Sequence, residues 1–311
     1  MANPMRYWSK DEDLQIKALR AKGSTMRDIA LTLNRPYHST RSRIHQLLTD
    51  QAVPFLTPDE CETRVVISRQ RRSTKLQAKA RTLISRMPNT KNMGYVIGVL
   101  YGDGFTNFKD IANGIPKSIG LSTTNASFRD AFIEALESWS GINTVKKAEH
   151  LVKEVRAPQG AIYRNVLYYD AWLHNRYLIT ELLKHTGPTQ TVLWSINTQE
   201  AISRGPDFCN GILQGLFDSD GSFSMSSNSM TISFGTASPN GANSLCKLLG
   251  LLSYDFHRYT TTEPNHRPFY RITLRTTNSK LKFTKQVGSR IDYKAALIAE
   301  FIRQKSGPQF L

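Results

Sequence analysis

The chain has 311 residues, 40% of them hydrophobic, which is enough for two or three domains and a sizeable buried core. Lys and Arg number 41 against 25 acidic residues, and the formal charge of +16 favours a polyanionic partner, nucleic acid before an anionic membrane. No apolar run reaches roughly 18 residues and no strongly amphipathic basic helix is present, so the sequence excludes a membrane span and disfavours membrane binding.

The N-terminus carries acids early and has no apolar segment typical of a secretory signal, so we expect a cytoplasmic location. A nucleoid-associated protein or a phage-infected cell fits that expectation. Cys61, Cys209 and Cys246 lie far apart and form no metal-binding spacing. We expect isolated thiols in a reducing compartment.

Residues 7–49 predict three short helices. Ser9 followed by Glu12 indicates a capping box at the start of the first helix, and Gly23 indicates its end. Thr25 followed by Asp28 indicates the start of the second helix. Three short helices in this order predict a helix-turn-helix candidate.

The third helix of this segment, expected from about residue 39 to 48, shows Arg41, Arg43 and His45 on its polar side. The segment resembles the Myb/SANT-like helical module over about 40 residues. The resemblance rests on Trp8-Ser9-x-x-Glu12-Asp13 and Gly23-Ser24-Thr25-x-x-x-Ile29-Ala30-x-x-Leu33-Asn34-Arg35. It implies that these three basic side chains face DNA. The alternative is a small bundle that packs against or binds protein.

A basic stretch follows, with eight Lys or Arg and no acid between Arg64 and Arg86. Such a run is typical of a solvated linker. Because it joins two candidate DNA-binding parts, we expect it to follow phosphates, with Arg71 and Arg72 as contacts.

The most informative feature is an internal duplication. The segment from Gly94 to Gly104 recurs from Gly211 to Gly221 at a constant offset of 117 residues. If each segment is a helix, the small residues fall on one face, since residues four apart lie above one another. These are Gly94, Gly98 and Gly102 in one copy, and Gly211, Gly215 and Ser219 in the other.

A glycine within a helix costs about 1 kcal/mol relative to alanine, so several in one helix indicate a need for close backbone approach. Two such faces would allow two helices to touch. Each copy ends in Asp-Gly, at Asp103-Gly104 and Asp220-Gly221. We expect each glycine to cap its helix in the left-handed conformation. Each aspartate would lie at a negative helix end, beside its counterpart, and a divalent cation such as Mg²⁺ would resolve that repulsion.

Both segments resemble the LAGLIDADG motif of homing endonucleases and related maturases. Residues 213–221 fit it closely, whereas residues 96–104 depart at the sixth place, where Tyr101 replaces an acid. The resemblance implies that Asp103 and Asp220 bind metal, with the backbone carbonyls of Gly102 and Ser219 as further ligands. Mg²⁺ is the expected cofactor and Mn²⁺ a substitute.

The resemblance covers about 210 residues and implies an α+β fold. Two pseudo-symmetric αββαββα repeats would form antiparallel DNA-binding sheets, with a small N-terminal three-helix module. We expect that module at residues 1–50, the basic linker at 51–90, repeat one at 91–200 and repeat two at 201–311. In chain order, the expected elements after residue 104 are strands at 105–108 and 118–125, a helix at 126–139, strands at 144–155 and 163–169, a helix at 177–183, a strand at 230–236, a helix at 243–251, strands at 255–262 and 269–276, and helices at 279–287 and 293–303.

The strands are rich in Ser, Thr, Arg and aromatic residues, which suits a sheet whose polar face contacts groove edges. We take seven of these side chains as DNA-binding candidates: Ser122, Thr124, Thr231, Ser233, Arg258, Arg271 and Arg275.

The family also implies a basic residue late in each repeat. Lys294 fits in the second repeat and is a candidate catalytic residue. Residues 187–191 of the first repeat carry no basic residue, and Lys184 lies earlier. This asymmetry suggests that the two DNA strands are cut at unequal rates. His174-Asn175 is similar to an HNH nuclease motif, but no other histidine has suitable spacing.

Together these features predict a monomeric, sequence-specific endonuclease that uses divalent metal to make a double-strand cut at a long DNA target. Two alternatives use the same fold: a maturase that binds intron RNA, and a noncatalytic DNA-binding regulator. Retention of both motif acids favours the enzyme.

Overall fold

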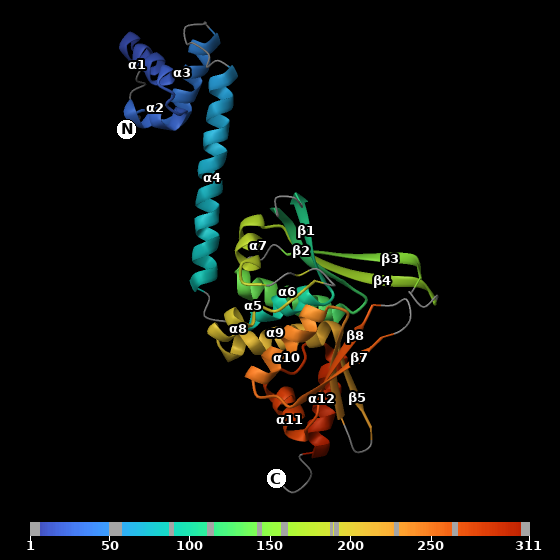
Figure 1. Cartoon of the computed structure of the whole chain (residues 1–311). Helices are drawn as coiled ribbons and strands as arrows, with labels where there is room; N and C mark the ends of the chain where they lie inside the picture. Colours follow the sequence, from blue (N-terminus) through green and yellow to red (C-terminus); the bar gives the residue numbers. More distant parts are fainter. Residues whose placement is uncertain are drawn as a thin grey trace. The chain divides into compact units, whose positions relative to one another are not determined.

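The structure is a computed structural model of the whole chain and is shown in Figure 1. It divides into two compact units, Met1–Lys75 and Leu76–Leu311. The described residues are 7–49, 58–86, 90–110, 115–141, 145–156, 161–186, 189, 193–226, 230–262 and 267–305.

The first unit begins with three helices, α1 (Lys10–Ala21), α2 (Met26–Thr32) and α3 (Tyr37–Thr49). Both expected capping boxes are present, from Ser9 to Glu12 and from Thr25 to Asp28. Gly23 has φ 87° after the end of α1, as expected for a glycine that stops a helix. The helices share a small apolar core, made of Ile16, Ile29, Leu33, Ile44 and Leu47.

The stretch that the sequence indicates as a basic linker is largely helical. Helix α4 spans Pro58–Arg86, and it crosses the boundary between the two compact units. After Pro58 its sequence has neither glycine nor proline and is rich in residues with high helix propensity. Within the described residues, no helix combines the length and apolar character that a membrane crossing requires.

The second unit contains two repeats with the same order of elements. The first repeat comprises α5 (Thr90–Tyr101), β1 (Gly104–Asp110), β2 (Ile115–Thr123), α6 (Ala126–Ser140), β3 (Lys146–Arg156), β4 (Ile162–Leu173) and α7 (Arg176–Leu183). The second comprises α9 (Pro206–Asp220), β5 (Gly221–Met225), β6 (Met230–Thr236), α10 (Pro239–Leu251), β7 (Phe256–Thr261), β8 (Phe269–Leu274) and α11 (Thr277–Gln286). Helix α8 (Thr198–Ser203) precedes the second repeat, and α12 (Asp292–Lys305) follows it.

Each repeat forms a four-stranded antiparallel sheet. The strand orders are β1-β2-β4-β3 and β5-β6-β8-β7, so the two sheets have the same topology. One continuous apolar core includes residues of both repeats. The predicted α+β class, with two antiparallel sheets in two repeats, is therefore confirmed.

Alternation along the strands gives each sheet a buried face and an open face. In the second sheet, Ile232, Phe234 and Ile272 are buried beneath the helices, so their strand neighbours point the other way. Ile119 and Ala171 do the same in the first sheet. We call the side away from the helices the open face of each sheet.

Candidate functional site

Helices α5 and α9 lie against each other through their glycines. A Cβ atom added to Gly98 would overlap the carbonyl oxygen of Ile212, and one added to Gly215 would overlap that of Tyr95. In the same way, Gly94 of α5 lies against the backbone of α9, and Gly211 of α9 lies against the backbone of α5. Because these neighbours are backbone atoms, no side chain can move aside, and only glycine permits this separation.

The same contact brings the ends of the two motifs together. Asp220 is the last residue of α9, and Asp103 lies in the turn that follows α5. A Cβ added to Gly102 would overlap the Cβ of Ser219 and would lie 3.2 Å from Oδ2 of Asp220. Both aspartates are exposed to solvent, so the pair is accessible from outside.

Gly104 and Gly221 do not adopt the left-handed cap that the sequence predicts. Gly221 has φ −78° and ψ 145°, and Gly104 is not among the residues with positive φ. Each glycine begins a strand directly after its motif. A Cβ added to Gly104 would lie 2.8 Å from Cα of Leu100, and one added to Gly221 would lie 2.6 Å from Cα of Phe217. These glycines provide space for an abrupt change from helix to strand.

The electrostatics of the pair disfavour two bare carboxylates. The surrounding protein removes part of the water around Asp220, and Asp103 adds repulsion, so the pKa of Asp220 rises to about 7. Loss of solvent also raises the pKa of Asp103. The positive charge of Lys294 opposes both shifts. A cation between the carboxylates would relieve the same repulsion.

A buried polar network anchors the end of α9, and the sequence did not reveal it. Asp218, only 2% exposed, accepts hydrogen bonds from the Tyr95 hydroxyl at 2.9 Å, the Arg290 backbone at 3.0 Å and the Ser289 hydroxyl. The Arg290 guanidinium lies 4.4 Å from the Tyr95 ring centre and donates to Gln214 at 2.9 Å. Burial raises the pKa of Asp218, and these donors oppose the shift. The network joins α5 of the first repeat to α9 of the second.

Lys294 lies beneath the second motif and is 3% exposed. Its ammonium group donates to the carbonyl oxygens of Phe217, Asp218 and Gly221, at 2.5, 3.0 and 2.8 Å. An ammonium group has three protons, so these carbonyls satisfy all of them. Burial lowers the pKa of Lys294, and Asp218, Asp103 and Asp220 oppose this effect. The geometry is that of a cation capping the C-terminal end of a helix.

The first repeat has an aromatic pair where the second has this polar network. Tyr101, at the sixth motif position, stacks on Trp194 with ring centres 5.3 Å apart. Lys184, the earlier candidate, makes a 2.8 Å ion pair with Glu181. Residues 187, 188 and 190–192 of the intervening segment lie outside the described residues. Tyr101 and Asp218 therefore have different surroundings, and the lack of a basic residue beneath the first motif stays a prediction.

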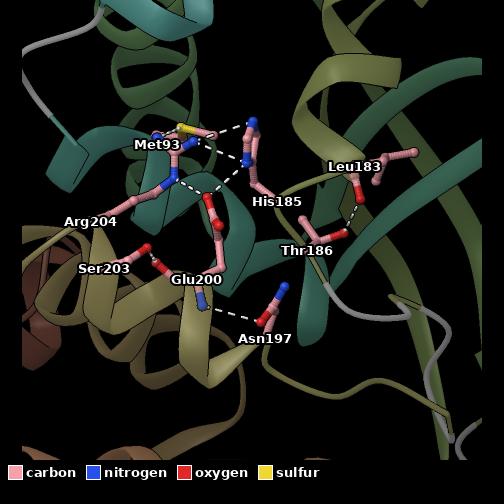
Figure 2. A network of polar contacts seen from close by, with 8 residues as sticks. All are labelled: Met93, Leu183, His185, Thr186, Asn197, Glu200, Ser203 and Arg204. Atoms are coloured by element: carbon pink, nitrogen blue, oxygen red, sulfur yellow. Dashed lines mark hydrogen bonds and ion pairs between the residues drawn. The ribbon is translucent and has the colours of Figure 1, made fainter.

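A second polar network fixes the segment between the repeats (Figure 2). Glu200 accepts from Arg204 at 2.6 Å and lies 2.8 Å from Nδ1 of His185. Arg204 also contacts the sulfur of Met93 near the start of α5. Burial and the neighbouring Arg204 charge lower the pKa of His185. The network connects the end of the first repeat with the helix pair.

The DNA-binding candidates on the sheets divide between the two faces. Ser122, Thr231 and Arg271 are exposed on open faces, whereas Ser233 is buried there and shares a 2.7 Å hydrogen bond with Ser222. Thr124 and Arg275 are exposed directly after β2 and β8.

Arg258 is on the other side of its sheet. Its guanidinium donates a hydrogen bond to Asn243 of α10 and lies 4.6 Å from the Tyr270 ring centre. Arg258 is two residues from Phe256 along β7, so both side chains point to the helix side of the sheet, whereas His257 points to the open face. Its assignment to the polar sheet face is wrong.

The candidates outside the repeats also differ in their surroundings. Arg41 and His45 are exposed on α3, whereas Arg43 makes an ion pair with Asp13 of α1. Arg71 and Arg72 are exposed on α4.

The HNH-like pair has a structural role. Asn175 accepts from the backbone of Leu178 at 3.1 Å and caps α7. The described part of the chain contains no cluster of three or more His, Cys, Asp or Glu suited to a metal ion. The candidate metal ligands are therefore the two motif acids and the backbone carbonyls near them.

Comparison with known proteins gives a family match for part of the chain. Residues 207–288, about a quarter of the chain, match the LAGLIDADG-like domain family. The matched region begins in α9 and ends just after α11. A comparison with curated proteins gives no match.

Solved structures with some similarity include homing endonucleases and one further protein. Mesophilic variants of I-DmoI share 11% identity over 64% of this chain and 96% of theirs, with a TM-score of 0.43. I-WcaI bound to its DNA recognition sequence shares 13% identity over 69% and 91%, with a TM-score of 0.42. Full-length DUF199/WhiA from Thermatoga maritima shares 10% identity over 74% and 66%, with a TM-score of 0.41. Identities this low do not transfer an activity.

Proposed function

We propose that the chain is a sequence-specific DNA endonuclease that requires a divalent metal and cuts both strands at a long target. The observation that carries the proposal is the glycine-mediated contact of α5 and α9, which ends in one carboxylate from each repeat. A site with one carboxylate from each of two similar repeats suits a substrate with two similar strands. The charge of +16 suits a nucleic-acid partner.

The donor set fits Mg²⁺, with Mn²⁺ as a substitute. Asp103 and Asp220 would supply carboxylate oxygens, and Gly102 and Ser219 would supply backbone carbonyls, which are the hard oxygen ligands that Mg²⁺ accepts. Loss of solvent and the neighbouring Asp103 charge raise the pKa of Asp220, and a cation bound between the two carboxylates would offset that repulsion. When bound, the metal would help activate water and stabilise charge on the phosphate.

The surrounding residues have positioning roles in this proposal. Lys294 uses its protons on the carbonyls at the end of α9, so we assign it to holding Asp220 and to offsetting the acidic charge. The sequence indicates Lys294 as a catalytic residue; direct contact with substrate would require it to give up these bonds. Asp218 fixes the same helix end from the other side.

The open faces of the sheets are the proposed DNA-contacting surface, with Ser122, Thr231, Arg271 and the adjoining Thr124 and Arg275 as contacts. Arg41 and His45 of α3, and Arg71 and Arg72 of α4, would add affinity if the N-terminal unit is a DNA-binding module. Such a module acts through effective concentration, so it needs no fixed orientation relative to the repeats. One chain holds both repeats, and we propose a monomer.

The cleavage test begins with the selection of a target. A duplex is selected from a random-sequence pool by binding in EDTA, and Mg²⁺ is then added. We expect both strands of the selected duplex to be cut, and Asp103→Asn or Asp220→Asn to abolish cutting while binding persists. Asp255→Asn is the matched control and should cut normally, because Asp255 is an exposed acid outside the motif pair.

Selection from an RNA pool in parallel separates the alternatives. Tight RNA binding without DNA cutting would favour a maturase, and duplex binding without metal-dependent cutting would favour a regulator. Labelling each DNA strand separately tests the asymmetry of the two halves. Because only the second motif has a lysine beneath it among the described residues, we expect one strand to be cut faster, with a nicked intermediate. Equal rates on both strands would contradict this part of the proposal.

A further inference from the structure

Tyr293 lies at the start of α12, between two residues that contact different repeats. The backbone nitrogen of Asp292 donates to the hydroxyl of Ser127, in α6 of the first repeat, at 3.3 Å. Lys294 donates to the carbonyl oxygens at the end of α9, in the second repeat. The first turn of α12 is therefore held where the two repeats meet.

The ring of Tyr293 is close to the end of the second motif and open to solvent. Its centre lies 6.0 Å from the ammonium nitrogen of Lys294. That nitrogen is 2.8 Å from the carbonyl oxygen of Gly221, the residue that follows Asp220. Tyr293 is 55% exposed, so a molecule bound at the acid pair can reach its side chain.

The hydroxyl of Tyr293 is a neutral donor in acidic surroundings. Partial burial raises the pKa of Tyr293, and the negative charges of Asp218 and Asp103 raise it further. The phenol therefore keeps its proton at neutral pH. A phosphate group that approaches the acid pair is negatively charged as well, and a protonated hydroxyl can donate a hydrogen bond to one of its oxygens.

Three other hydroxyls around the end of α9 are already engaged within the protein. Tyr95 and Ser289 both donate to one buried carboxylate, and Ser219 donates to a backbone carbonyl of its own helix. The three protons of Lys294 are used as well. By contrast, the hydroxyl of Tyr293 has no hydrogen-bond partner among the described residues, so it is free to bind a ligand.

We propose that Tyr293 is a catalytic residue whose hydroxyl donates a hydrogen bond to a non-bridging oxygen of the DNA phosphate cut at the acid pair. A donor held in place before the reaction stabilises the charge that develops on the phosphate, and a hydrogen bond to a charged group is stronger than one between neutral groups. The hydroxyl keeps its proton throughout and forms no covalent bond. Tyr293 occurs once, so it contacts one of the two scissile phosphates. The inference rests on the proposed endonuclease activity.

Strand-specific cutting by the full chain tests the inference. Tyr293→Phe removes the hydroxyl and retains the ring. With each strand of the selected duplex labelled separately, the variant should cut one strand about tenfold more slowly than the wild type does and should cut the other at the wild-type rate. Thermal unfolding should be unchanged, because the hydroxyl has no partner among the described residues. The matched control is Tyr163→Phe, since Tyr163 is 57% exposed and shares the helix side of β4 with Ala171.

A second measurement follows binding without cutting. Duplexes that carry one methylphosphonate at either mapped cut position lack a charged phosphate oxygen, and their affinities in EDTA are compared with that of the unmodified duplex. At one cut position, the effect of the modification should differ about tenfold between the wild type and Tyr293→Phe, because only the wild type has a hydrogen bond to lose there. Tyr163→Phe should show the wild-type effect at both positions.

Wild-type cutting rates on both strands in Tyr293→Phe would overturn the inference, as would equal slowing of both strands. A methylphosphonate effect of the same size in the wild type and in Tyr293→Phe would also overturn it. In each of these cases the wild-type chain still cuts, so the endonuclease proposal stands. A wild-type chain that binds the selected duplex but does not cut it in Mg²⁺ would overturn both.

Discussion

Replacing Gly98 by alanine should separate the two motif helices. The added Cβ would overlap the carbonyl of Ile212 and would lie 2.9 Å from the backbone nitrogen of Leu216. Restoring van der Waals separations near 3.5 Å would require the helices to move apart by roughly 1 Å. Overpacking of this kind costs about 3 kcal/mol at the upper end of its usual range, and the higher helix propensity of alanine returns about 1 kcal/mol.

We therefore expect Gly98→Ala to lower the free energy of unfolding by about 2 kcal/mol. The matched control is Gly250→Ala in α10, where an added Cβ meets no atom within 4 Å. That change should stabilise the protein by up to about 1 kcal/mol. For a unit the size of Leu76–Leu311, the Gly98 variant should melt roughly 4–8 °C lower than the wild type.

The same displacement would pull Asp103 away from Asp220. A misplacement of about 1 Å at a reactive site can reduce the rate by roughly a hundredfold. Urea or thermal unfolding measures the first effect, and Mg²⁺-dependent cutting of the selected duplex measures the second. The reasoning would be refuted if Gly98→Ala matched Gly250→Ala in both stability and cutting rate.

Three further changes test the electrostatics and the anchoring of the site. Asp220 has a folded pKa of about 7, above its unfolded value, so its contribution to the free energy of unfolding is lost as pH rises from about 4 to 7. In the absence of metal, Asp220→Asn should therefore be more stable than the wild type at pH 8 but not at pH 4. The same pH dependence of urea unfolding in both proteins would contradict this. Lys294→Met removes the charge that lowers the pKa of Asp220, so the pH profile of cutting should move to higher pH. Lys285→Met is the control and should leave the profile in place. An unchanged profile in Lys294→Met would show that Lys294 exerts no charge effect. Asp218→Ala leaves the Tyr95 hydroxyl without its acceptor and should cost about 3 kcal/mol in unfolding measurements, and a loss below about 1 kcal/mol would mean that the network does not anchor α9.

The repeated glycine spacing predicted the central part of the fold. Because glycine is costly in a helix, its recurrence at every fourth position in both segments indicated a backbone contact, and Gly98 and Gly215 make that contact. The positions of Asp103 and Asp220 follow from the same spacing. Strands of the first repeat were also predicted from local patterns, whereas the short strand β5 was not.

Other features depend on information that local patterns do not contain. Tyr95 and Asp218 are separated by 123 residues, so their hydrogen bond appears only when the two repeats pack. Arg258 was assigned to the wrong face because its alternation depends on where β7 begins. The charge run of α4 resembled a linker, although its lack of glycine and internal proline was the available signal for a helix.

The central claim is that Asp103 and Asp220 hold one divalent cation site in common. Electron paramagnetic resonance can follow Mn²⁺ binding to the complex with the selected duplex, for the wild type and for each aspartate-to-asparagine variant. We predict that each single variant weakens Mn²⁺ binding at least tenfold, equivalent to about 1.4 kcal/mol, while Asp255→Asn leaves it unchanged. Full Mn²⁺ affinity in either Asp103→Asn or Asp220→Asn would contradict the account.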